Sequence, residues 1–589
     1  MSIDAAPRPF RGPWEGDTKI VIGIDIGTTQ SGVAFAFLQN GASQVIHRVT
    51  RWPGQEAHNQ QGKIPTIVWY DSSKKAVSFG AEAQLFTTEE KAEDNGWVLA
   101  RYFKLHLHPS DMQARHELKL DDLPPGVTLR QIYSDFLGYL LKHTRAFFED
   151  RILDGKQIWE RYSPTMEVVI AHPNGWGIRE QAFLRSAAVS AGFATADLAP
   201  AKVRFVTEAE ASVHFCIHHT NLGNVLQPGT NFAVCDAGGS TVDTTLYSVK
   251  SARPILKLEE KRASACVQAG AIFVDFEAEK FFRRTLASAG LSREDVADYT
   301  KTGVKDFENF AKRAFHDEAA EQSVAVAHTR FNNTAIRARR GRLTLSGSKI
   351  KEFFDMGSAY RTFSWLGDLV IVPIFEANSR NDMSHEVRGL HSPMIQRQKL
   401  SPMVQSSGVL LAVFILVLHD TRLEPLLLPR SSLVFTADSG RTSYMNAKGE
   451  PVVSWCMVSD SPKGSGLGLR SGMPKIIHST LYDCESPDLE LFTVELLAFL
   501  GEYTPEWAYD PHNDLCPGFR DSCTIRANLR NLEGALTSGT GRHGSRYWSL
   551  DFDICIRFGG TELESYIEWE ERGIKRKGPV AIISQEIDL

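Results

Sequence analysis

The stretch KIVIGIDIGTT, residues 19–29, gives the clearest indication of the fold of this chain. Residues 19–26 are almost continuously apolar and rich in β-branched side chains, which predicts a strand buried on both faces. The turn at Gly27-Thr28-Thr29 ends this run, and apolar residues resume from Val33 to Leu38. The stretch therefore predicts a strand, a tight turn and a returning strand.

A second stretch repeats this pattern later in the chain. Residues 232–236 (FAVCD) predict a buried strand, residues 237–240 (AGGS) a turn, and residues 241–249 a returning strand. When the two turns are aligned, an Asp ends each strand, Asp25 or Asp236, and a Gly follows two positions later. Such a duplication predicts two related lobes that each present the tip of a hairpin.

The length and composition narrow the class of protein. A chain of 589 residues predicts roughly two to four domains. With 42% hydrophobic and 23% charged residues, most of it should be globular rather than disordered. A net charge of -6 argues against a protein that wraps nucleic acid, because such proteins carry a basic field.

Neither a secretion signal nor a membrane span is expected. Residues 1–19 contain no apolar core of the kind found in signal peptides. The longest apolar run, Val409 to Leu418, has ten residues, which is too short to span a bilayer. Eight dispersed cysteines without a CxxC pair argue against a disulfide scaffold. We therefore expect a cytoplasmic protein, with the nucleus as the alternative location.

Several common catalytic motifs are absent from the sequence. It contains no GxxxxGK[ST] loop, no HExxH motif, no EF-hand loop and no GxSxG nucleophile elbow. P-loop NTPases are excluded on this ground, and so are enzymes built on the other three motifs. The two hairpin turns are the strongest remaining candidates for a functional site.

The two hairpin tips suit a phosphate-bearing ligand. A Gly-rich turn after a strand presents backbone N–H groups to phosphate oxygens. Hydroxyl groups stand beside both turns, on Thr28, Thr29, Ser240 and Thr241. Asp25 and Asp236 would repel phosphate unless a cation lay between them, and Mg²⁺ fits because carboxylates can hold it through its waters. Asp243 could add a third carboxylate. The alternative interpretation is two ordinary tight hairpins with Asp and Gly as turn residues.

The motifs around these turns resemble one known family. GIDIGTTQSGVAF (23–35) resembles the first phosphate motif of the 70-kDa heat-shock chaperone family, in the actin-like ATPase superfamily, and VCDAGGSTVDTTLY (234–247) resembles the second. Further similar segments are SFGAEAQ (78–84), VVIAHPNGW (168–176), EQAFLRSAAVSAGF (180–193) and VTEAEASVHF (206–215). The segment FGGTELESYIEWEERG (558–573) resembles the tail of a divergent chaperone-like branch.

This resemblance implies an α/β fold, with a two-lobed actin-like (ribonuclease-H-like) ATPase domain followed by a β-rich C-terminal domain. The expected organisation is a mobile tail over 1–17, lobe I over 18–205, lobe II over 206–355, an anomalous segment over 356–440 and the β-rich domain over 441–589. The anomalous segment lacks periodicity over most of its length, so we expect it to be poorly packed.

The resemblance also implies roles for individual residues. Asp25, Gly27, Thr28 and Thr29 would hold the phosphates from lobe I, and Asp236, Gly238, Gly239, Ser240 and Thr241 from lobe II. Asp25 and Asp236 would bind the metal through water. Glu208 would order the water shell of the metal, and Asp243 would lie near the attacking water. Gly270 would belong to the site, and Lys312 and Arg313 would flank the adenosine; the alternative for this basic pair is a solvated helix face.

Two departures from the family pattern bear on activity. Gln84 stands where the family has a Lys near the γ-phosphate, and a Gln cannot supply positive charge to a phosphoryl transition state. The family closes the adenine pocket with a GGxxxS/P-type loop that is expected after Phe354, and no such loop is found there; the Gly-Gly pairs of the sequence are 238–239 and 559–560. We therefore expect slow hydrolysis.

The resulting hypothesis is an ATP·Mg-binding, chaperone-like protein with weak or absent hydrolysis, whose cofactors are ATP or ADP and Mg²⁺. Its partners would be the nucleotide and protein clients or co-chaperones, without nucleic acid or membrane. A non-hydrolysing nucleotide-sensing scaffold and a small-molecule kinase on the same fold are the alternatives.

Overall fold

The computed structural model describes residues 13–56, 60–109, 121–219, 226–252, 256–267, 270–315 and 317–357, and the strands and short flanking stretches named below beyond residue 411. The expected tail over 1–17 lies mostly outside these residues. The chain divides into two compact units. The first comprises residues 1–175, 207–258 and 264–419, and the second comprises residues 176–206, 259–263 and 420–589.

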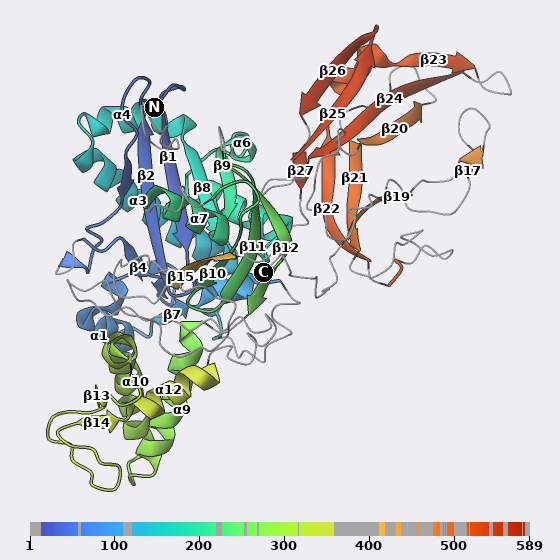
Figure 1. Cartoon of the computed structure of the whole chain (residues 1–589). Helices are drawn as coiled ribbons and strands as arrows, with labels where there is room; N and C mark the ends of the chain where they lie inside the picture. Colours follow the sequence, from blue (N-terminus) through green and yellow to red (C-terminus); the bar gives the residue numbers. More distant parts are fainter. Residues whose placement is uncertain are drawn as a thin grey trace, which may run out of the picture. The chain divides into compact units, whose positions relative to one another are not determined.

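The first hairpin forms the centre of a sheet in the first unit (Figure 1). Strand β1 (Lys19–Ile26) pairs antiparallel with β2 (Gln30–Leu38) and parallel with β8 (Glu167–His172). β3 (Ile46–Arg48) forms the outer edge beside β2, and β4 (Lys63–Pro65) also pairs with β2. Along β1 fully buried residues alternate with half-buried ones, so one face of the strand packs more tightly than the expected two-sided burial.

Helices and a smaller sheet cover this sheet. α3 (Leu129–Arg151) begins at the cap Thr128, whose hydroxyl accepts from the Gln131 N–H, and its Phe148 packs on Phe35 of β2. The smaller sheet has the order β6-β5-β7. The remaining elements are β5 (Ile67–Tyr70), β6 (Ala76–Phe79), η2 (Glu82–Gln84), α1 (Phe86–Asp94), β7 (Val98–Arg101), η3 (Phe103–Leu107), α4 (Gly155–Tyr162) and η4 (Ser163–Thr165).

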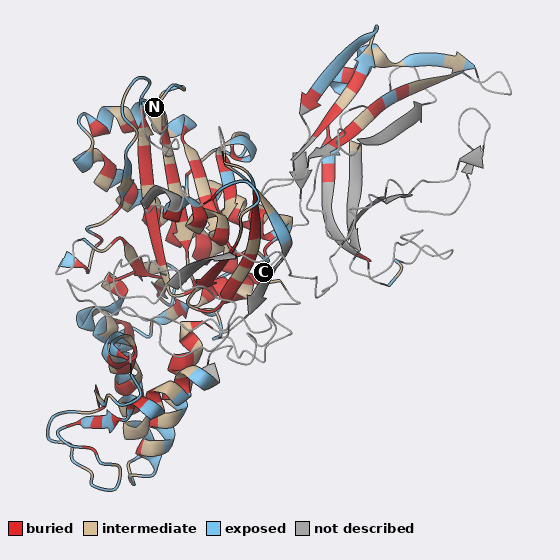
Figure 2. Cartoon of the chain, viewed as in Figure 1, coloured by how far each residue is buried: buried red, intermediate tan, exposed pale blue. Residues whose placement is uncertain are grey.

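The second hairpin forms the corresponding part of another sheet, with the order β12-β11-β10-β15. β10 (Asn231–Ala237) pairs antiparallel with β11 (Val242–Ser251), and β12 (Lys257–Val267) follows. α7 (Glu208–His219) covers it through Ala209 and Val213, which pack with Phe232 and Val234 of β10. Most of β10 is buried (Figure 2).

Part of the anomalous segment joins this sheet. The apolar run at 409–418 forms β15 (Ala412–Leu418), which pairs antiparallel with β10 along seven residues. The run therefore supplies the edge strand of the sheet that contains the second hairpin, although its surroundings in the sequence show no periodicity. Most of the rest of 356–440 lies outside the described residues.

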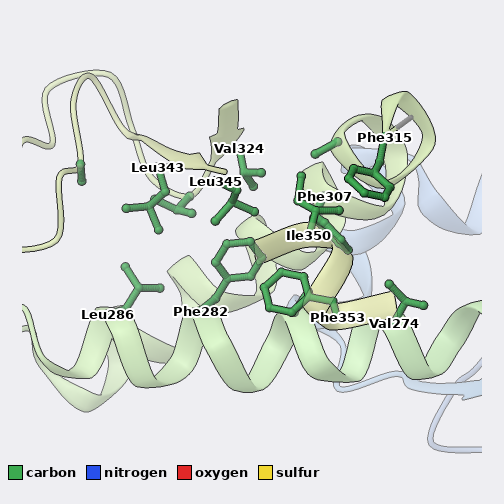
Figure 3. Packing of buried hydrophobic residues seen from close by; sticks show 14 residues of the cluster. Val274, Phe282, Leu286, Phe307, Phe315, Val324, Leu343, Leu345, Ile350 and Phe353 are labelled. Atoms are coloured by element: carbon green, nitrogen blue, oxygen red, sulfur yellow. The ribbon is translucent and has the colours of Figure 1, made fainter. Parts of the chain in front are cut away.

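A helical group extends from the second sheet and has its own core (Figure 3). Val274 and Phe282 of α9 (Ala271–Ala287) pack there against Phe307, Ile350 and Phe353. The sequence from Val304 to Phe315 predicts an α-helix. The helix there is not regular, because α10 (Arg293–Asp306) passes into a π-helical turn, η5 (Phe307–Ala311), before α11 (Lys312–Ala314). The group also holds β13 (Gln322–Ala325), β14 (Arg342–Leu345) and α12 (Gly347–Gly357).

The second unit is β-rich, as predicted. Apolar and polar residues alternate at 548–558, with Cys555 among the polar set, which predicts a half-buried strand with which residues 566–569 pair. This stretch forms β24 (Arg546–Arg557), where Leu550, Phe552 and Ile554 are buried while Asp551 is exposed. Cys555 is also buried, contrary to its expected place on the polar face. Residues 566–569 pair back on β24 within β25 (Glu564–Glu571), as expected.

Two five-stranded sheets make up most of this unit, in the orders β19-β16-β21-β22-β27 and β20-β24-β25-β26 with β23 beside β24. Its other elements are α5 (Ile178–Ser190), α6 (Ala199–Lys202), β9 (Val203–Thr207), β16 (Ser432–Thr436), β17 (Tyr444–Met445), β18 (Pro451–Val452), β19 (Cys456–Val458), β20 (Lys475–Tyr482), β21 (Phe492–Phe499), β22 (Phe519–Ala527), η8 (Arg530–Ala535), β23 (Thr537–Thr540), β26 (Ile574–Pro579) and β27 (Ala581–Ile583).

Candidate functional site

The tips of the two hairpins meet within the first unit. The hydroxyl groups of Thr28 and Ser240 form a buried hydrogen bond of 2.7 Å. The Thr29 side chain lies against Gly239, where an added Cβ would be 2.7 Å from the Thr29 Oγ1. The two turns, which are far apart in the sequence, thus lie side by side, as a ligand site formed by both turns requires.

The two turns are closed in the same way. The Gly27 N–H donates to the Gln30 carbonyl at 3.1 Å, and the Gly238 N–H donates to the Thr241 carbonyl at 2.8 Å. An added Cβ on Gly27 would lie 2.3 Å from the Gln30 carbonyl oxygen, so this position requires glycine. Because these two N–H groups close the turns, the phosphate-facing donors predicted for both glycines are already engaged.

Lobe I supplies cations as well as a carboxylate. Asp25, at the end of β1, accepts from the Lys63 ammonium at 2.7 Å. Partial burial acts to raise the pKa of Asp25, but the positive charges of Lys63 and Lys104 outweigh it and hold the pKa below its ordinary value. Lys104 of η3 is buried and contacts Glu208, the first residue of α7, at 2.6 Å.

Lobe II supplies buried carboxylates. Asp236 and Asp243 lie opposite each other in the β10–β11 register, and their exposed fractions are only 6% and 2%. The Thr241 hydroxyl donates to the Asp243 Oδ2 at 2.9 Å. The Asp236 Oδ1 is buried and has no hydrogen-bond partner among the described residues. Such an atom is costly unless a ligand or ordered water satisfies it.

The electrostatics of this cluster are unbalanced. Burial, together with the negative charges of Glu208, Asp243 and Asp25, raises the pKa of Asp236 to about 8. Burial also raises the pKa of Glu208 despite its contact with Lys104. The cluster comprises the carboxyl groups of Asp25, Glu208, Asp236 and Asp243 and the ammonium groups of Lys63 and Lys104. This excess of acidic groups favours a bound cation.

Gly270 anchors α9 beneath the second turn. Its N–H donates to the Ser240 carbonyl, while the N–H groups of Ala271 and Ile272 donate to the carbonyls of Gly238 and Gly239. An added Cβ on Gly270 would lie 2.5 Å from the Ser240 nitrogen. Gly270 is therefore at the predicted site, but it acts by allowing two backbone segments to approach closely.

Lys312 and Arg313 do not form a solvated basic face. The Lys312 ammonium is buried and lies 2.6 Å from the Asp275 carboxylate, so that alternative is wrong. Burial raises the pKa of Asp275 to about 7 even though Lys312 opposes the shift. The Arg313 Nε donates to the Glu308 carbonyl at 3.1 Å.

Sequence reasoning missed the two site lysines. Gln84, expected near the γ-phosphate, is exposed at the end of η2, and Lys63 and Lys104 are the cations that accompany the carboxylates. The available signal was the segment FKLHL (103–107), in which a lysine stands between residues with strongly apolar side chains. Lysine is seldom buried unless it is paired.

Direct metal coordination is not evident in the part of the chain that the structure describes, where no group of three or more His, Cys, Asp or Glu side chains is positioned to hold an ion. The described helices also include none that is long and apolar enough to cross a bilayer.

Comparison with known proteins identifies distant relatives. No protein-family model matches the chain. Over 317 residues it is 24% identical to mouse (Mus musculus) heat shock 70 kDa protein 12A, covering 44% of this chain and 45% of the relative. Over 340 residues it is 23% identical to the human (Homo sapiens) heat shock 70 kDa protein 12B, covering 48% of each chain. The chain spans about half the length of the curated relatives it matches.

These matches confirm the resemblance seen in the motifs. The chain is a distant homologue of heat shock 70 kDa proteins 12A and 12B, divergent members of that family. This homology implies an actin-like fold for the mixed α/β part of the chain.

Proposed function

We propose that this protein is a chaperone-like ATP·Mg-binding protein whose nucleotide phosphates lie between the two hairpin turns. The observation that carries the proposal is the meeting of two identically closed turns at Thr28 and Ser240, beside a cluster of buried carboxylates. Two ordinary hairpins would not require buried acidic groups to converge at their tips.

The residues present fit a divalent cation. Asp236 has a buried oxygen without a hydrogen-bond partner among the described residues, and its raised pKa reflects uncompensated negative charge around it. Because no three-ligand group was found among those residues, Asp25 and Asp236 would hold Mg²⁺ through its waters. When bound, the ion would neutralise charge on the phosphate oxygens.

The side chains of this site would divide the remaining work. Lys63 and Lys104 place positive charge beside the phosphates, where it stabilises negative charge that develops during phosphoryl transfer. Glu208 and Asp243 are the groups that would orient a water molecule and accept its proton. The Thr29 hydroxyl, and whichever of Thr28 and Ser240 accepts in their mutual hydrogen bond, would donate to phosphate oxygens. The Thr241 hydroxyl donates to Asp243 and would have to turn away from it to do the same.

Weak hydrolysis was expected because Gln84 was taken to replace a lysine. Gln84 is exposed on η2, whereas the Lys104 ammonium is buried against Glu208, and this lysine from another segment can supply the positive charge that Gln84 lacks. We therefore propose that bound ATP is hydrolysed with the help of Lys104. The non-hydrolysing scaffold remains the competing function, and no observation favours the kinase.

Fluorescent ADP binding followed by single-turnover hydrolysis of ATP tests both parts. We expect saturable, Mg²⁺-dependent ADP binding and a measurable first turnover in the wild type. Binding without a turnover would establish the scaffold, and the absence of any nucleotide binding would overturn the proposal. A role with protein clients rests on homology alone and would be tested by suppression of aggregation of an unfolded protein with and without ATP.

A further inference from the structure

A second polar cavity lies at the outer edge of the lobe I sheet. It has a volume of about 510 Å³, and its lining includes His47, Arg48, Thr50, Arg51, Phe147 and Arg151. β2 separates the edge strand β3 from β1, so the cavity shares no residue with the hairpin tips. We call it the arginine pocket.

Three arginine residues from separate parts of the chain line this pocket. Arg48 ends β3, Arg51 lies in the loop that follows, and Arg151 ends α3. A positive side chain at the C-terminus of α3 offsets the partial negative charge of that helix end. Because these residues come from β3, the loop after it and the end of α3, they line one volume rather than one face of a single helix.

The positive charge of the pocket is only partly compensated. The Arg51 guanidinium contacts the Asp150 carboxylate at 2.7 Å, but both side chains are more than 60% exposed, so this pair is weak and can exchange partners. Arg48 donates to the Gln60 carbonyl, which carries no charge. Within the described residues no carboxylate forms an ion pair with Arg48 or Arg151.

Several features of the chain hold these side chains in place. Arg51 has a positive φ of 60°, a costly conformation for a residue with a Cβ. The Arg48 side chain lies over Gly62, where an added Cβ would be 2.4 Å from the Arg48 Cδ. His47 stacks on Phe35 with ring centroids 5.1 Å apart. The pocket is thus a built feature of the fold.

His47 adds a neutral group to the lining. Burial and the nearby charge of Arg151 lower the pKa of His47 below its ordinary value. The imidazole can therefore donate or accept a hydrogen bond without adding to the positive charge at neutral pH.

We propose that the arginine pocket binds a small anion that carries two or more phosphate groups. Guanidinium forks match phosphate oxygens in pairs, and three of them suit a ligand with several such groups. The Thr50 hydroxyl adds a donor, and Phe147 gives an apolar wall. The volume lies in the range of about 300–1,000 Å³ typical of small-molecule sites. This proposal is independent of the nucleotide site.

Calorimetric titration with inorganic tripolyphosphate tests the proposal, with Mg²⁺ and ADP present to occupy the hairpin site. We expect one binding event that weakens at least tenfold in the R48Q/R151Q double variant, because two charge-assisted contacts are lost. The matched control is Arg145→Gln, on the same helix but outside the pocket and paired with Glu149, which should leave the affinity unchanged.

A gain-of-affinity variant guards against misfolding of the double variant. Asp150→Asn releases Arg51 and should tighten tripolyphosphate binding about two- to fivefold. Citrate, which offers three carboxylates, should bind at least tenfold more weakly, and ATP added beyond saturation of the hairpin site reports whether nucleotides are accepted as the polyphosphate. Undetectable tripolyphosphate binding, equal binding by citrate, or affinity unchanged in both R48Q/R151Q and Asp150→Asn would overturn the proposal.

Discussion

The two hairpins share a backbone but differ in charge. Both close through a glycine N–H that donates to the carbonyl three residues later. In the first, the residue opposite Asp25 is Gly32, and Lys63 neutralises the carboxylate. In the second, the residue opposite Asp236 is another carboxylate, Asp243. The fold of the half-site is therefore duplicated, whereas its electrostatics are divided between a balanced half and an acidic half.

The sheets around the hairpins differ as well. β1 has a parallel neighbour, β8, but β10 has an antiparallel neighbour, β15, from the distant apolar run. The turns are therefore the repeated unit, whereas the strands that flank the two hairpins differ in direction.

The largest expected effect concerns the cations, which come from lobe I. Lys104→Met keeps an apolar chain of similar length but removes the charge beside Glu208. We expect the single-turnover rate of ATP hydrolysis to fall by about 10²–10³-fold, the usual result of losing one such electrostatic contact. Gln84→Lys, on the exposed end of η2, should leave the rate unchanged. A faster rate of hydrolysis in Gln84→Lys would show instead that residue 84 lies near the phosphates.

Next in size is the loss of backbone contact in the acidic half. Gly270→Ala forces a Cβ to within 2.5 Å of the Ser240 nitrogen and should separate α9 from the second turn. We expect at least a 100-fold loss of ADP affinity and a loss of stability of about 1–3 kcal/mol. The control is Gly138→Ala within α3, where an added Cβ meets no atom within 4 Å, and which should be neutral or slightly stabilising. Unchanged ADP binding in Gly270→Ala would show that the second turn does not contact the nucleotide.

Removal of the negative charge at Asp236 and at Asp25 should affect stability in opposite directions. At neutral pH folding forces the Asp236 carboxyl group to take up a proton, and Asp236→Asn removes this cost, so we expect a higher melting temperature together with about 10–100-fold weaker Mg·ADP binding. Asp25→Asn leaves Lys63 without its carboxylate, so both melting temperature and binding should fall. Thermal unfolding without ligand, followed by a binding titration, measures both. Equal melting shifts in the two variants would contradict the proposed asymmetry.

The pH dependence of stability should show the same asymmetry. The pKa of Asp236 is raised to about 8 in the folded protein, so the unfolded chain binds fewer protons at this residue above about pH 4. Its contribution to the free energy of unfolding is therefore present at low pH and is lost as pH rises toward 8. The free energy of unfolding of the wild type, minus that of Asp236→Asn, should fall by roughly 5 kcal/mol across this window, because folding raises the pKa from 3.8 to about 8. A flat difference in denaturant titrations would contradict the assignment.

The smallest expected effect comes from the contact between the halves. Thr28→Val removes the hydrogen bond to Ser240 while keeping the shape of the side chain. We expect a loss of about 1 kcal/mol in stability and a two- to fivefold loss in ADP affinity. A Ser240→Ala change should not add to it, because both remove one interaction. Additive losses in the double variant would show that the two hydroxyls act separately.

The sequence predicted features that depend on neighbouring residues. The hairpins at 19–38 and 231–251 and the strand β24 follow from short apolar patterns, which tertiary context did not override. The π-helical turn at 307–311 was missed because the apolar spacing there also suits an α-helix.

Contacts between residues far apart in the sequence could not be predicted from such local patterns. Lys63 meets Asp25, and Lys104 meets Glu208, only because the sheet and α7 bring distant segments together. Gln84 was placed by a local likeness that contains few distinctive residues, and the structure puts it at an exposed helix end. The same reason explains β15, whose partner strand lies far away in the sequence.

Calorimetry tests most directly whether both halves build one Mg-nucleotide site. ADP is titrated with and without Mg²⁺, at pH 7, in two buffers of different ionisation enthalpy. We expect a single Mg²⁺-dependent binding event with proton release, because a cation beside Asp236 lowers its raised pKa. Asp236→Asn should bind more weakly and release fewer protons. Binding that does not depend on Mg²⁺, or proton release that is identical in the wild type and Asp236→Asn, would contradict the account.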